Sequence, residues 1–519
     1  MAPSLVLWLV AWGASFSWAG SLLGALCAIG GGVAFSRLAR RPEALSLRAA
    51  YLAGILFYLG ITPWMPRAIL NYYSQTSATG WHALIGYLGS GLYMGLQILL
   101  VTFLLRVCQI RIIRDLLLVA PLSWCLMEVL FPTPFPWFFG NLLRAVEPLT
   151  QLASIGGVPL VSFVSLWLIA ILFDWSCRIS FLKRVSLFVL VLLPSLLYWQ
   201  YRENLLTNAI SKAKTVTVSL VQGNDPILAE RSFENIERKL ETYLTLSSQV
   251  RPQPDLFVWP EGAYIGIIPY GAKKFSESFS TDLPPIRRPL IFAGLTQAEA
   301  ADSTHPYFQI SAMLLSPGGS LSLEYQKRRT LPFAEDLPLK DAFPFMTKLF
   351  GKRYFVPGES IHPITVTRPH GRGGVPTGAP FRVAPAICYE DTIPELFQET
   401  IKTYNVELLV GVSNSQWFES DLAVQEQALL ASFRAIEEGK YFLRAASVGL
   451  TQAFDPRGRV IGELPPNSEN VLTLSVPLLA QDTIFSHFGM LPARLSTLFV
   501  LLILVLCYPF SRIRRASQP

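Results

Sequence analysis

The sequence predicts a multi-pass α-helical membrane bundle of about eight spans that carries one α/β domain outside the membrane. The 519 residues are 51% hydrophobic and 15% charged, whereas soluble proteins average about 25% charged residues. The apolar residues concentrate in residues 1–205 and 490–511, and residues 206–485 have a mixed globular composition. A domain of about 280 residues can bury a core of its own.

The membrane spans are predicted from apolar runs long enough to cross a bilayer, which takes about 20 residues at 1.5 Å each. Only Ser17 and Trp18 separate the first two runs. A single helix there would measure roughly 50 Å against a hydrocarbon core of about 30 Å, so we expect a tight helical pair. The first run lacks a basic leader and is not expected to be a signal peptide. The predicted spans are residues 4–16, 19–36, 48–66, 82–106, 114–131, 151–174, 182–201 and 492–511.

Basic residues predict the orientation of these spans. They cluster after the even-numbered spans, and the loops after the third and fifth spans carry little beyond Arg67 and Arg144. Positive charge marks the cytoplasmic side, so the α/β domain between the seventh and eighth spans is expected outside the cytoplasm. The clusters are Arg37, Arg40, Arg41 and Arg48; Arg106, Arg111 and Arg114; Arg178, Lys183 and Arg184; and Arg512, Arg514 and Arg515.

The predicted domains are therefore a seven-span bundle over 1–205, an α/β domain over 206–485, and an eighth helix with a basic cytoplasmic tail over 486–519. The net charge of +7 is explained by orientation. Nucleic-acid binding is not expected, because no basic patch is interleaved with aromatic residues.

Two features of the membrane part leave alternatives open. Glu128 lies inside the fifth predicted span, where an ionised carboxylate costs about 2.5–3.5 kcal/mol. It is either a protonated packing residue of the bundle interior or a contact to a lipid headgroup or to the outer domain. The proline-broken aromatic segment Pro132–Phe138 is either an interfacial aromatic belt or a substrate contact.

Apolar strands alternate with helices in the outer domain, which indicates an α/β fold with a covered sheet. A mobile loop is expected over Arg368–Pro380. The predicted helices are Phe233–Gln249, Ile393–Tyr404 and Ala423–Gly439. The predicted strands are Thr215–Gln222, Leu256–Trp259, Pro289–Thr296, Gln309–Ser316, Val383–Cys388, Glu407–Ser413 and Ala446–Phe454.

Three predicted elements end in reactive groups: Glu261, Lys327 and Cys388. Each has an ordinary explanation, since a lone cysteine is most often a small buried hydrophobe and the other two are usually solvated. Together the three groups fit nucleophilic catalysis by a thiol. A free thiol has a pKa of about 8.5 and needs a base. A buried carboxylate can serve, and a lysine can stabilise the oxyanion of a tetrahedral intermediate.

Other chemistries have less support in the sequence. None of the five histidines lies near Cys388 in the sequence, so a Cys–His pair would have to form by folding. No Cys/His cluster has the spacing of a metal site. We therefore expect no metal and no cofactor.

The order Glu261, Lys327, Cys388 resembles the Glu–Lys–Cys signature of the nitrilase superfamily. With the predicted spans, the chain is similar over essentially its whole length to the apolipoprotein N-acyltransferase family. The resemblance implies a nitrilase-like αββα sandwich. The matching motifs are Val221-Gln222-Gly223-Asn224, Trp259-Pro260-Glu261, Tyr325-Gln326-Lys327, Leu331-Pro332-Phe333-Ala334-Glu335, Ile387-Cys388-Tyr389-Glu390, Asn414 with Trp417-Phe418, and Phe135-Pro136-Trp137.

The resemblance also implies residue roles. Cys388 would be the nucleophile, Glu261 the general base and Lys327 the oxyanion stabiliser. The implied supporting residues are Glu335, Tyr389 and Glu390, and the implied substrate-binding residues are Trp417 and Asn414.

Two segments depart from the family pattern, which puts substrate-loop shape and acceptor preference in question. The family's Asn-Asp-x-Trp-Phe-Gly is Asn414-Ser415-Gln416-Trp417-Phe418-Glu419 here, and its Asn-Asn/Thr-Gly is Ser447-Val448-Gly449.

The activity implied by the resemblance is ping-pong acyl transfer from a phospholipid, through a cysteine thioester, to the α-amine of a diacylglyceryl-apolipoprotein. The expected protein is a monomer of the bacterial inner membrane with its catalytic domain on the extracytoplasmic side. Two alternatives remain at this point. One is a membrane-anchored carbon–nitrogen hydrolase, which would release ammonia from amides. The other is a transporter or receptor, which would pair polar residues across several spans.

Overall fold

The computed structural model divides the chain into two compact units, described one at a time below. The helical unit comprises Met1–Pro66, Leu84–Leu206 and Thr483–Pro519, and the sandwich unit comprises Arg67–Ala83 and Thr207–Asp482. The structure describes residues 2–17, 21–40, 42–73, 80–174, 179–225, 232–278, 287–298, 307–337, 340–345, 347, 355–368 and 378–516. The predicted loop Arg368–Pro380 lies largely outside these residues.

Each of the eight apolar runs overlaps a helix of the structure, but the run 48–66 extends from α3 into α4 and the run 114–131 from α6 into α7. Ser21 and Ser46 cap the second and third of these helices by accepting the N–H of Gly24 and Ala49. The helices of this part are α1 (Ala2–Ser17), α2 (Leu22–Leu38), α3 (Leu47–Ile61), α5 (Gly80–Val107), α6 (Arg111–Asp115), α7 (Val119–Leu130), α8 (Glu147–Thr150), α9 (Ala153–Phe173), α10 (Phe181–Lys212), α15 (Ile484–Phe488) and α16 (Leu491–Ala516).

Length and composition identify fewer membrane spans than the sequence predicts. Within the described residues, α5, α9 and α10 are long and apolar enough to cross a membrane, and α3 with its bent continuation α4 (Met65–Tyr73) makes a fourth candidate. The apolar helices at Val6–Ser15, Leu22–Leu38, Val119–Leu130 and Leu491–Leu506 are shorter. A membrane protein is therefore supported, and the count of eight spans stays a prediction.

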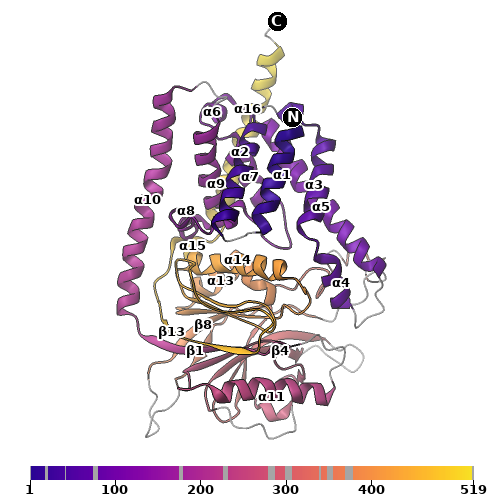
Figure 1. The fold of residues 1–519 in the computed structure, drawn as a ribbon, viewed down its shortest axis with the longest axis vertical. Coiled ribbons are helices and arrows are strands. Elements are labelled where there is room, and N and C mark those ends of the chain that lie inside the picture. The colour runs from indigo at the N-terminus through magenta and orange to yellow at the C-terminus, as the bar shows by residue number, and fades with distance from the viewer. Residues whose placement is uncertain are drawn as a thin grey trace. The chain divides into compact units, whose positions relative to one another are not determined.

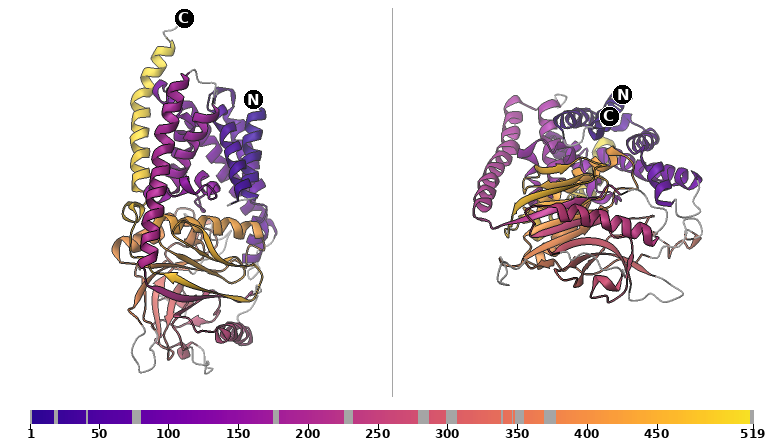
Figure 2. Two further views of the ribbon diagram at one scale, coloured as in Figure 1. Left: turned by 60° about the vertical axis from the view of Figure 1, so that its left-hand side comes forward. Right: turned by 60° about the horizontal axis from the view of Figure 1, so that its bottom comes forward.

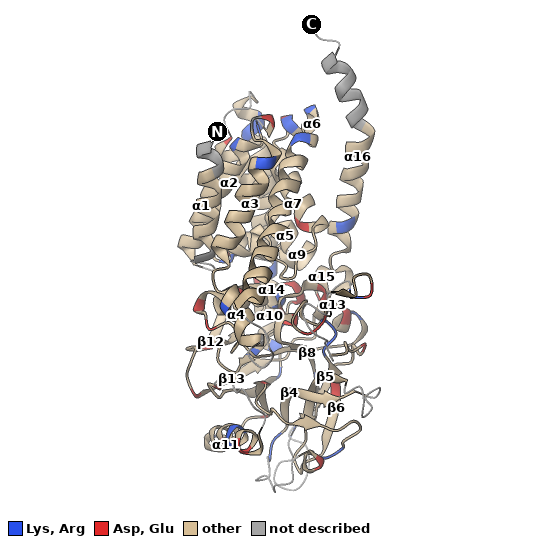
Figure 3. Ribbon diagram, turned by 90° about the vertical axis from the view of Figure 1, so that its right-hand side faces the viewer, with Lys and Arg blue, Asp and Glu red and all other residues tan. Residues whose placement is uncertain are grey.

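Basic residues occur at one end of the helical unit, around α6 and at the end of α2 (Figure 3). Arg106, at the end of α5, donates to the backbone oxygen of Leu45 at 2.5 Å. Arg40 forms an ion pair with Asp174, which follows α9. Arg184, in the first turn of α10, donates to the Asp174 backbone oxygen at 2.7 Å. These contacts place the ends of several helices at the same end of the bundle.

Glu128 faces the interior of the helical unit. Its Oε1 accepts from Trp124 Nε1 at 2.6 Å, from the Phe139 backbone N–H at 2.6 Å and from Ser162 Oγ at 3.2 Å. The carboxyl therefore joins α7, α9 and the 3₁₀ turn η2 (Phe139–Leu143). This arrangement fits the interpretation of Glu128 as a packing residue.

The sandwich unit is built from two stacked sheets, as Figures 1 and 2 show. The seven-stranded sheet has the order β13-β1-β2-β4-β5-β6, with β3 paired to β4, and the six-stranded sheet has the order β12-β11-β10-β9-β8-β7. The strands of the first sheet are β1 (Thr215–Gln222), β2 (Leu256–Glu261), β3 (Ile267–Ile268), β4 (Leu290–Gln297), β5 (Phe308–Leu315), β6 (Leu321–Gln326) and β13 (Asn470–Pro477). Those of the second are β7 (Ile364–Val366), β8 (Phe381–Ile387), β9 (Leu408–Ser413), β10 (Phe442–Ala446), β11 (Thr451–Phe454) and β12 (Val460–Leu464).

Helices cover the outer face of each sheet, so the unit is an αββα sandwich (Figure 1). Apolar residues such as Val218 and Val410 fill the space between the sheets. Leu240 of α11 (Phe233–Gln249) packs on the outer face of the first sheet. Phe397 of α13 (Pro394–Thr403) and Ala431 of α14 (Asp421–Glu438) pack on the second. Because apolar side chains meet layers on both faces, the central strands are apolar at nearly every position.

The strand predicted over Ala446–Phe454 is wrong. The structure has two antiparallel strands there, β10 and β11, joined by a turn that contains Gly449. Thr451 Oγ1 accepts the backbone N–H of Ala446 at 3.1 Å, which closes the turn. An apolar run gave no sign of this reversal, because both strands and the turn are buried.

The first and last strands of the sandwich pair with each other. β1 and β13 run antiparallel, with Thr215 opposite Pro477 and Gln222 opposite Asn470. The strand that opens the domain therefore begins beside the residue at which the closing strand ends.

Candidate active site

The three predicted reactive groups lie at the carboxyl ends of strands. Glu261 is the last residue of β2, Lys327 follows β6 directly, and Cys388 follows β8. The central strands of both sheets are parallel, β1-β2-β4 in one and β8-β9-β10 in the other. Parallel strands bring their carboxyl ends to the same edge of a sheet, where α/β proteins usually bind ligands. The two sheets together thus bring an acid, an amine and a thiol to one place.

Glu261 is a buried carboxyl whose pKa responds to Lys327 and to the Cys388 thiol. Burial raises the pKa of Glu261 to about 7, and the positive charge of Lys327 offsets part of that rise. Its Oε2 has no hydrogen-bond partner within the part of the chain that the structure describes. A carboxyl that titrates near neutral pH and keeps an oxygen unoccupied is suited to accept a proton.

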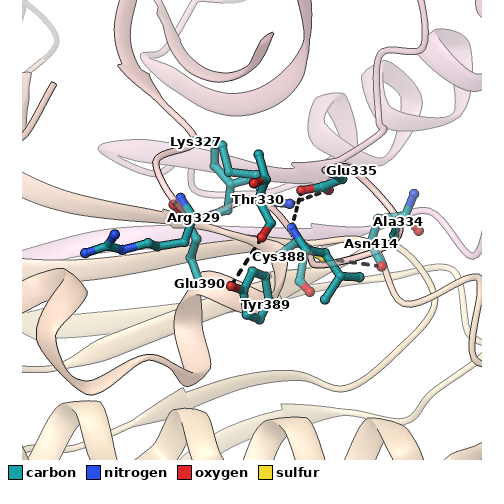
Figure 4. A network of polar contacts seen from close by, with 12 residues as sticks. Lys327, Arg329, Thr330, Ala334, Glu335, Cys388, Tyr389, Glu390 and Asn414 are labelled. Carbon is teal, nitrogen blue, oxygen red and sulfur yellow. Dashed lines mark hydrogen bonds and ion pairs between the residues drawn. The ribbon is translucent and has the colours of Figure 1, made fainter. Parts of the chain in front are cut away.

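Lys327 is held by Glu335. Its Nζ donates to Glu335 Oε1 at 2.6 Å, and the side chain is almost fully buried. Glu335 Oε2 accepts the Leu331 backbone N–H at 2.8 Å, which fixes the carboxylate in turn. Burial alone would lower the pKa of Lys327, but Glu335, Cys388 and Glu261 together raise that pKa well above its ordinary value. The amine is therefore a permanent cation. Figure 4 shows Lys327 near Cys388.

Cys388 sits on a strained turn. Its φ of +56° lies in the left-handed region, which is costly for residues other than glycine and is often found at functional sites. Burial, and then the charge of Glu261, raise the pKa of the thiol above its ordinary value, although Lys327 opposes this. The thiol of Cys388 is therefore neutral before the reaction. A base must remove its proton as the sulfur attacks.

Glu390 ties the nucleophile turn to the strand end that carries Lys327. Its Oε1 accepts the backbone N–H groups of Arg328 at 2.8 Å and Arg329 at 2.9 Å, and its Oε2 accepts that of Ile387 at 2.9 Å. The Tyr325 hydroxyl lies 3.0 Å from both oxygens. A fully buried carboxylate with this many donors fixes two backbone segments at once.

Tyr389 directly follows the nucleophile in the sequence. Its hydroxyl donates to the Thr330 backbone oxygen at 3.4 Å, and Lys327 Nζ lies 6.0 Å from the centre of its ring. The Tyr389 ring thus lies within reach of a cation–π contact with the Lys327 ammonium (Figure 4).

The two predicted substrate-binding residues lie on the loop after β9. Cys388 Sγ lies 3.9 Å from the backbone oxygen of Asn414. The Asn414 side chain is used within the protein, since its Oδ1 accepts from the Gln416 backbone N–H at 3.1 Å and from Ser447 Oγ at 3.0 Å. Trp417 stacks edge to face on Tyr72, with 5.2 Å between the ring centres. Asn414 therefore meets the thiol through its backbone, and Trp417 contacts a distant part of the sequence.

The sequence did not predict the buried ion pair between Asp391, which lies close to the nucleophile in the sequence, and Arg444. Arg444 Nε donates to Asp391 Oδ2 at 2.7 Å, and both side chains are almost fully buried. Arg444 also donates to Ser413 Oγ at 3.1 Å. The pair connects the turn that follows Cys388 to the end of β9. A charged residue inside the apolar strand Phe442–Ala446 was the available signal, because a buried arginine needs an anionic partner.

Comparisons with known proteins match both units. The model of the carbon-nitrogen hydrolase family matches residues 217–481, and that of the apolipoprotein N-acyltransferase N-terminal domain matches residues 10–171. An apolipoprotein N-acyltransferase of Geobacter metallireducens is 27% identical over 472 residues, covering 87% of this chain and 84% of that protein. Those of Wigglesworthia glossinidia brevipalpis and Shewanella oneidensis are 25% identical over 382 residues and 28% identical over 396 residues. Each covers 72% of this chain, with 72% and 71% of the relatives covered.

Proposed function

Because the chain belongs to the carbon-nitrogen hydrolase family and to its apolipoprotein N-acyltransferase branch, we propose that it transfers a fatty acyl group from a phospholipid to the α-amine of the N-terminal diacylglyceryl-cysteine of apolipoproteins. The observation that carries the chemistry is the buried cluster of Glu261, Lys327 and Cys388. The acyl group passes through a thioester on Cys388, so the reaction is ping-pong.

In the first half-reaction, Cys388 Sγ attacks the carbonyl carbon of a phospholipid acyl ester while Glu261 takes the thiol proton. The unoccupied Oε2 of Glu261 and a pKa of about 7 suit this step. Lys327 stabilises the oxyanion of the tetrahedral intermediate, where losing one donor typically costs about 10²–10³ in rate. The C–O bond then breaks, Glu261 returns the proton to the leaving oxygen, and a lysophospholipid departs.

In the second half-reaction, the acceptor's α-amine attacks the thioester carbon. Glu261 takes a proton from the attacking nitrogen, Lys327 again faces the oxyanion, and the C–S bond breaks to leave an amide. The sulfur recovers its proton from Glu261. Excluding water from the thioester favours this transfer over hydrolysis.

The supporting roles follow from the contacts. Glu335 orients Lys327 through the 2.6 Å ion pair. Glu390 holds the nucleophile turn, and Tyr389 flanks the lysine. Trp417 and Asn414 belong to the loop that we assign to the substrate entrance.

We place the protein in the bacterial inner membrane as a monomer with eight spans, and the sandwich on the extracytoplasmic side. Two observations support the orientation. Basic residues occur at one end of the helical unit (Figure 3), and positive charge marks the cytoplasmic side. The sandwich lies in the sequence between α10 and α16, whose C-terminal end carries the last basic cluster.

The test is mass spectrometry of the purified full-length protein after incubation with a single phospholipid. We expect an acyl adduct on Cys388 and one lysophospholipid per adduct, and neither product in Cys388→Ala. A wild-type protein that forms no adduct, or an alanine variant with wild-type turnover, would refute the assignment. Ammonia release from amides without lysophospholipid would favour the rival carbon–nitrogen hydrolase.

A further inference from the structure

From Arg67 onward, the helix α4 belongs to the sandwich unit, although it precedes the first strand of that unit by about 140 residues in the sequence. Pro63 ends the preceding helix α3, because proline cannot donate the next helical hydrogen bond. Pro66 then lies in the first turn of α4, where proline is tolerated. The short helix that results is a separate element, and Arg67–Ala83 group with the sandwich.

One face of α4 holds the loop that carries Trp417. Asn71 Nδ2 donates to the Trp417 backbone oxygen at 3.2 Å. The Tyr72 ring meets the Trp417 ring edge to face at a centre-to-centre distance of 5.2 Å. Arg67 forms an ion pair with Glu419, two residues further along the loop. Three side chains of the helix thus contact the loop, at a backbone oxygen, an aromatic ring and a carboxylate.

The Arg67–Glu419 contact lies at a strained position of the loop. Glu419 has a φ of +43°, which is in the left-handed region. A side chain at such a position costs about 1–2 kcal/mol relative to glycine. The carboxylate that this side chain supplies is the group that Arg67 binds. The loop therefore carries backbone strain together with an anchor to α4.

The same helix contacts the turn that orients Lys327. The Tyr72 hydroxyl donates to the Ala334 backbone oxygen at 2.9 Å. Ala334 directly precedes Glu335, whose Oε1 lies 2.6 Å from Lys327 Nζ. The turn itself is tight, since Phe333 has a φ of +66° and its N–H donates to the Asp336 oxygen at 2.6 Å. A shift of this turn would move Glu335 and, through it, the lysine.

We propose that α4 is a clamp that holds two active-site loops at once, so that Arg67, Asn71 and Tyr72 are positioning residues of the acyl transfer. The loops are Leu331–Glu335 and Asn414–Glu419. This rests on the proposed function. The residues of the clamp have different effects. The Tyr72 hydroxyl positions Lys327 through the turn at Ala334 and Glu335, and so sets the rate of thioester formation. Arg67 positions the loop that carries Trp417, and so sets the affinity for the phospholipid.

This division distinguishes positioning from simple packing. If α4 only stabilised the unit, weakening either contact would reduce the amount of active enzyme and leave the two kinetic parameters of the remainder unchanged. If α4 is a clamp, the limiting rate and the half-saturating phospholipid concentration respond to different residues.

The experiment measures Cys388 thioester formation by mass spectrometry across phospholipid concentrations, using the full chain in proteoliposomes. Tyr72→Phe keeps the ring and removes only the hydroxyl. We expect its limiting rate to fall about 3–10-fold with half-saturation unchanged, since one hydrogen bond is worth about 0.5–1.5 kcal/mol. The matched control is Tyr404→Phe, which removes an exposed hydroxyl bonded to His362 and should leave both parameters unchanged.

Arg67→Gln should raise the half-saturating phospholipid concentration about 2–5-fold at an unchanged limiting rate, as expected for an exposed ion pair. The exchange of charges in Arg67→Glu with Glu419→Arg should restore it. A Tyr72→Phe variant equal to wild type, or an Arg67→Gln variant that the exchange does not rescue, would overturn the clamp.

Hydrogen exchange separates a failed clamp from a failed function. Tyr72→Leu should increase amide exchange in residues 331–336 and 414–419 whether or not the wild-type protein forms a thioester. Unchanged exchange in both loops would overturn the clamp. A wild-type protein without thioester would refute only the proposed function.

Discussion

Replacing Glu390 by glutamine tests whether the nucleophile turn is held by the buried carboxylate. Both oxygens of Glu390 accept backbone N–H groups, those of Arg328 and Arg329 on one side and that of Ile387 on the other. Glutamine has the same shape but only one accepting oxygen. Whichever way the amide is turned, an N–H of the side chain therefore faces an N–H of the backbone.

The cost can be worked from these contacts. If the amide oxygen faces Arg328 and Arg329, the Ile387 N–H is left unpaired, which costs about 1–3 kcal/mol. The two remaining hydrogen bonds lose their charge assistance, at up to about 1 kcal/mol each. The sum is about 1–5 kcal/mol. Ile387 directly precedes Cys388, so we expect the loss to fall on the turn and to slow thioester formation by about 10²-fold.

The assay is the rate of acyl-adduct formation on Cys388, measured by quenched-flow mass spectrometry. The control is Glu399→Gln, which neutralises a partly exposed carboxylate that pairs with Arg328, and it should change the rate by less than about threefold. A Glu390→Gln variant with the wild-type rate would show that the turn does not depend on the carboxylate.

Three further outcomes are expected. Burial raises the pKa of Glu261 to about 7, so adduct formation should fall about tenfold per pH unit below that value as the base is protonated, whereas Glu261→Gln should be slow at every pH. Arg444→Met leaves Asp391 buried without its ion pair and should lower the free energy of unfolding by about 3–5 kcal/mol in denaturant titrations, with partial recovery on adding Asp391→Asn. Cys388→Gly should be about 1 kcal/mol more stable than Cys388→Ala, because glycine adopts a φ of +56° without strain; equal stabilities would contradict this.

Local patterns predicted a large part of the sandwich. The strand Thr215–Gln222 and the helix Phe233–Gln249 have the predicted bounds, because their apolar spacing matches the periods of a buried strand and an amphipathic helix. The helix also begins at a serine cap, Ser232. The positions of Glu261 and Cys388 at strand ends followed from the same reading, since an apolar run that stops at a polar residue marks the edge of a sheet.

The contacts that organise the site could not be predicted in this way. Tyr72 and Ala334 are 262 positions apart, and Arg67 and Glu419 are 352 apart. No pattern within a window of the sequence connects such residues. The strand prediction over Ala446–Phe454 failed for a related reason, because a buried turn has the same apolar composition as the strands beside it.

The antiparallel pairing of β1 with β13 places the first and last strands of the sandwich side by side, with Thr215 opposite Pro477. A module whose ends meet can be removed from a host chain, or spliced into one, through a single point of attachment. Within the segment Thr207–Asp482, the chain therefore enters and leaves the two sheets at neighbouring points, and Arg67–Ala83 are the part of the unit that comes from elsewhere in the sequence.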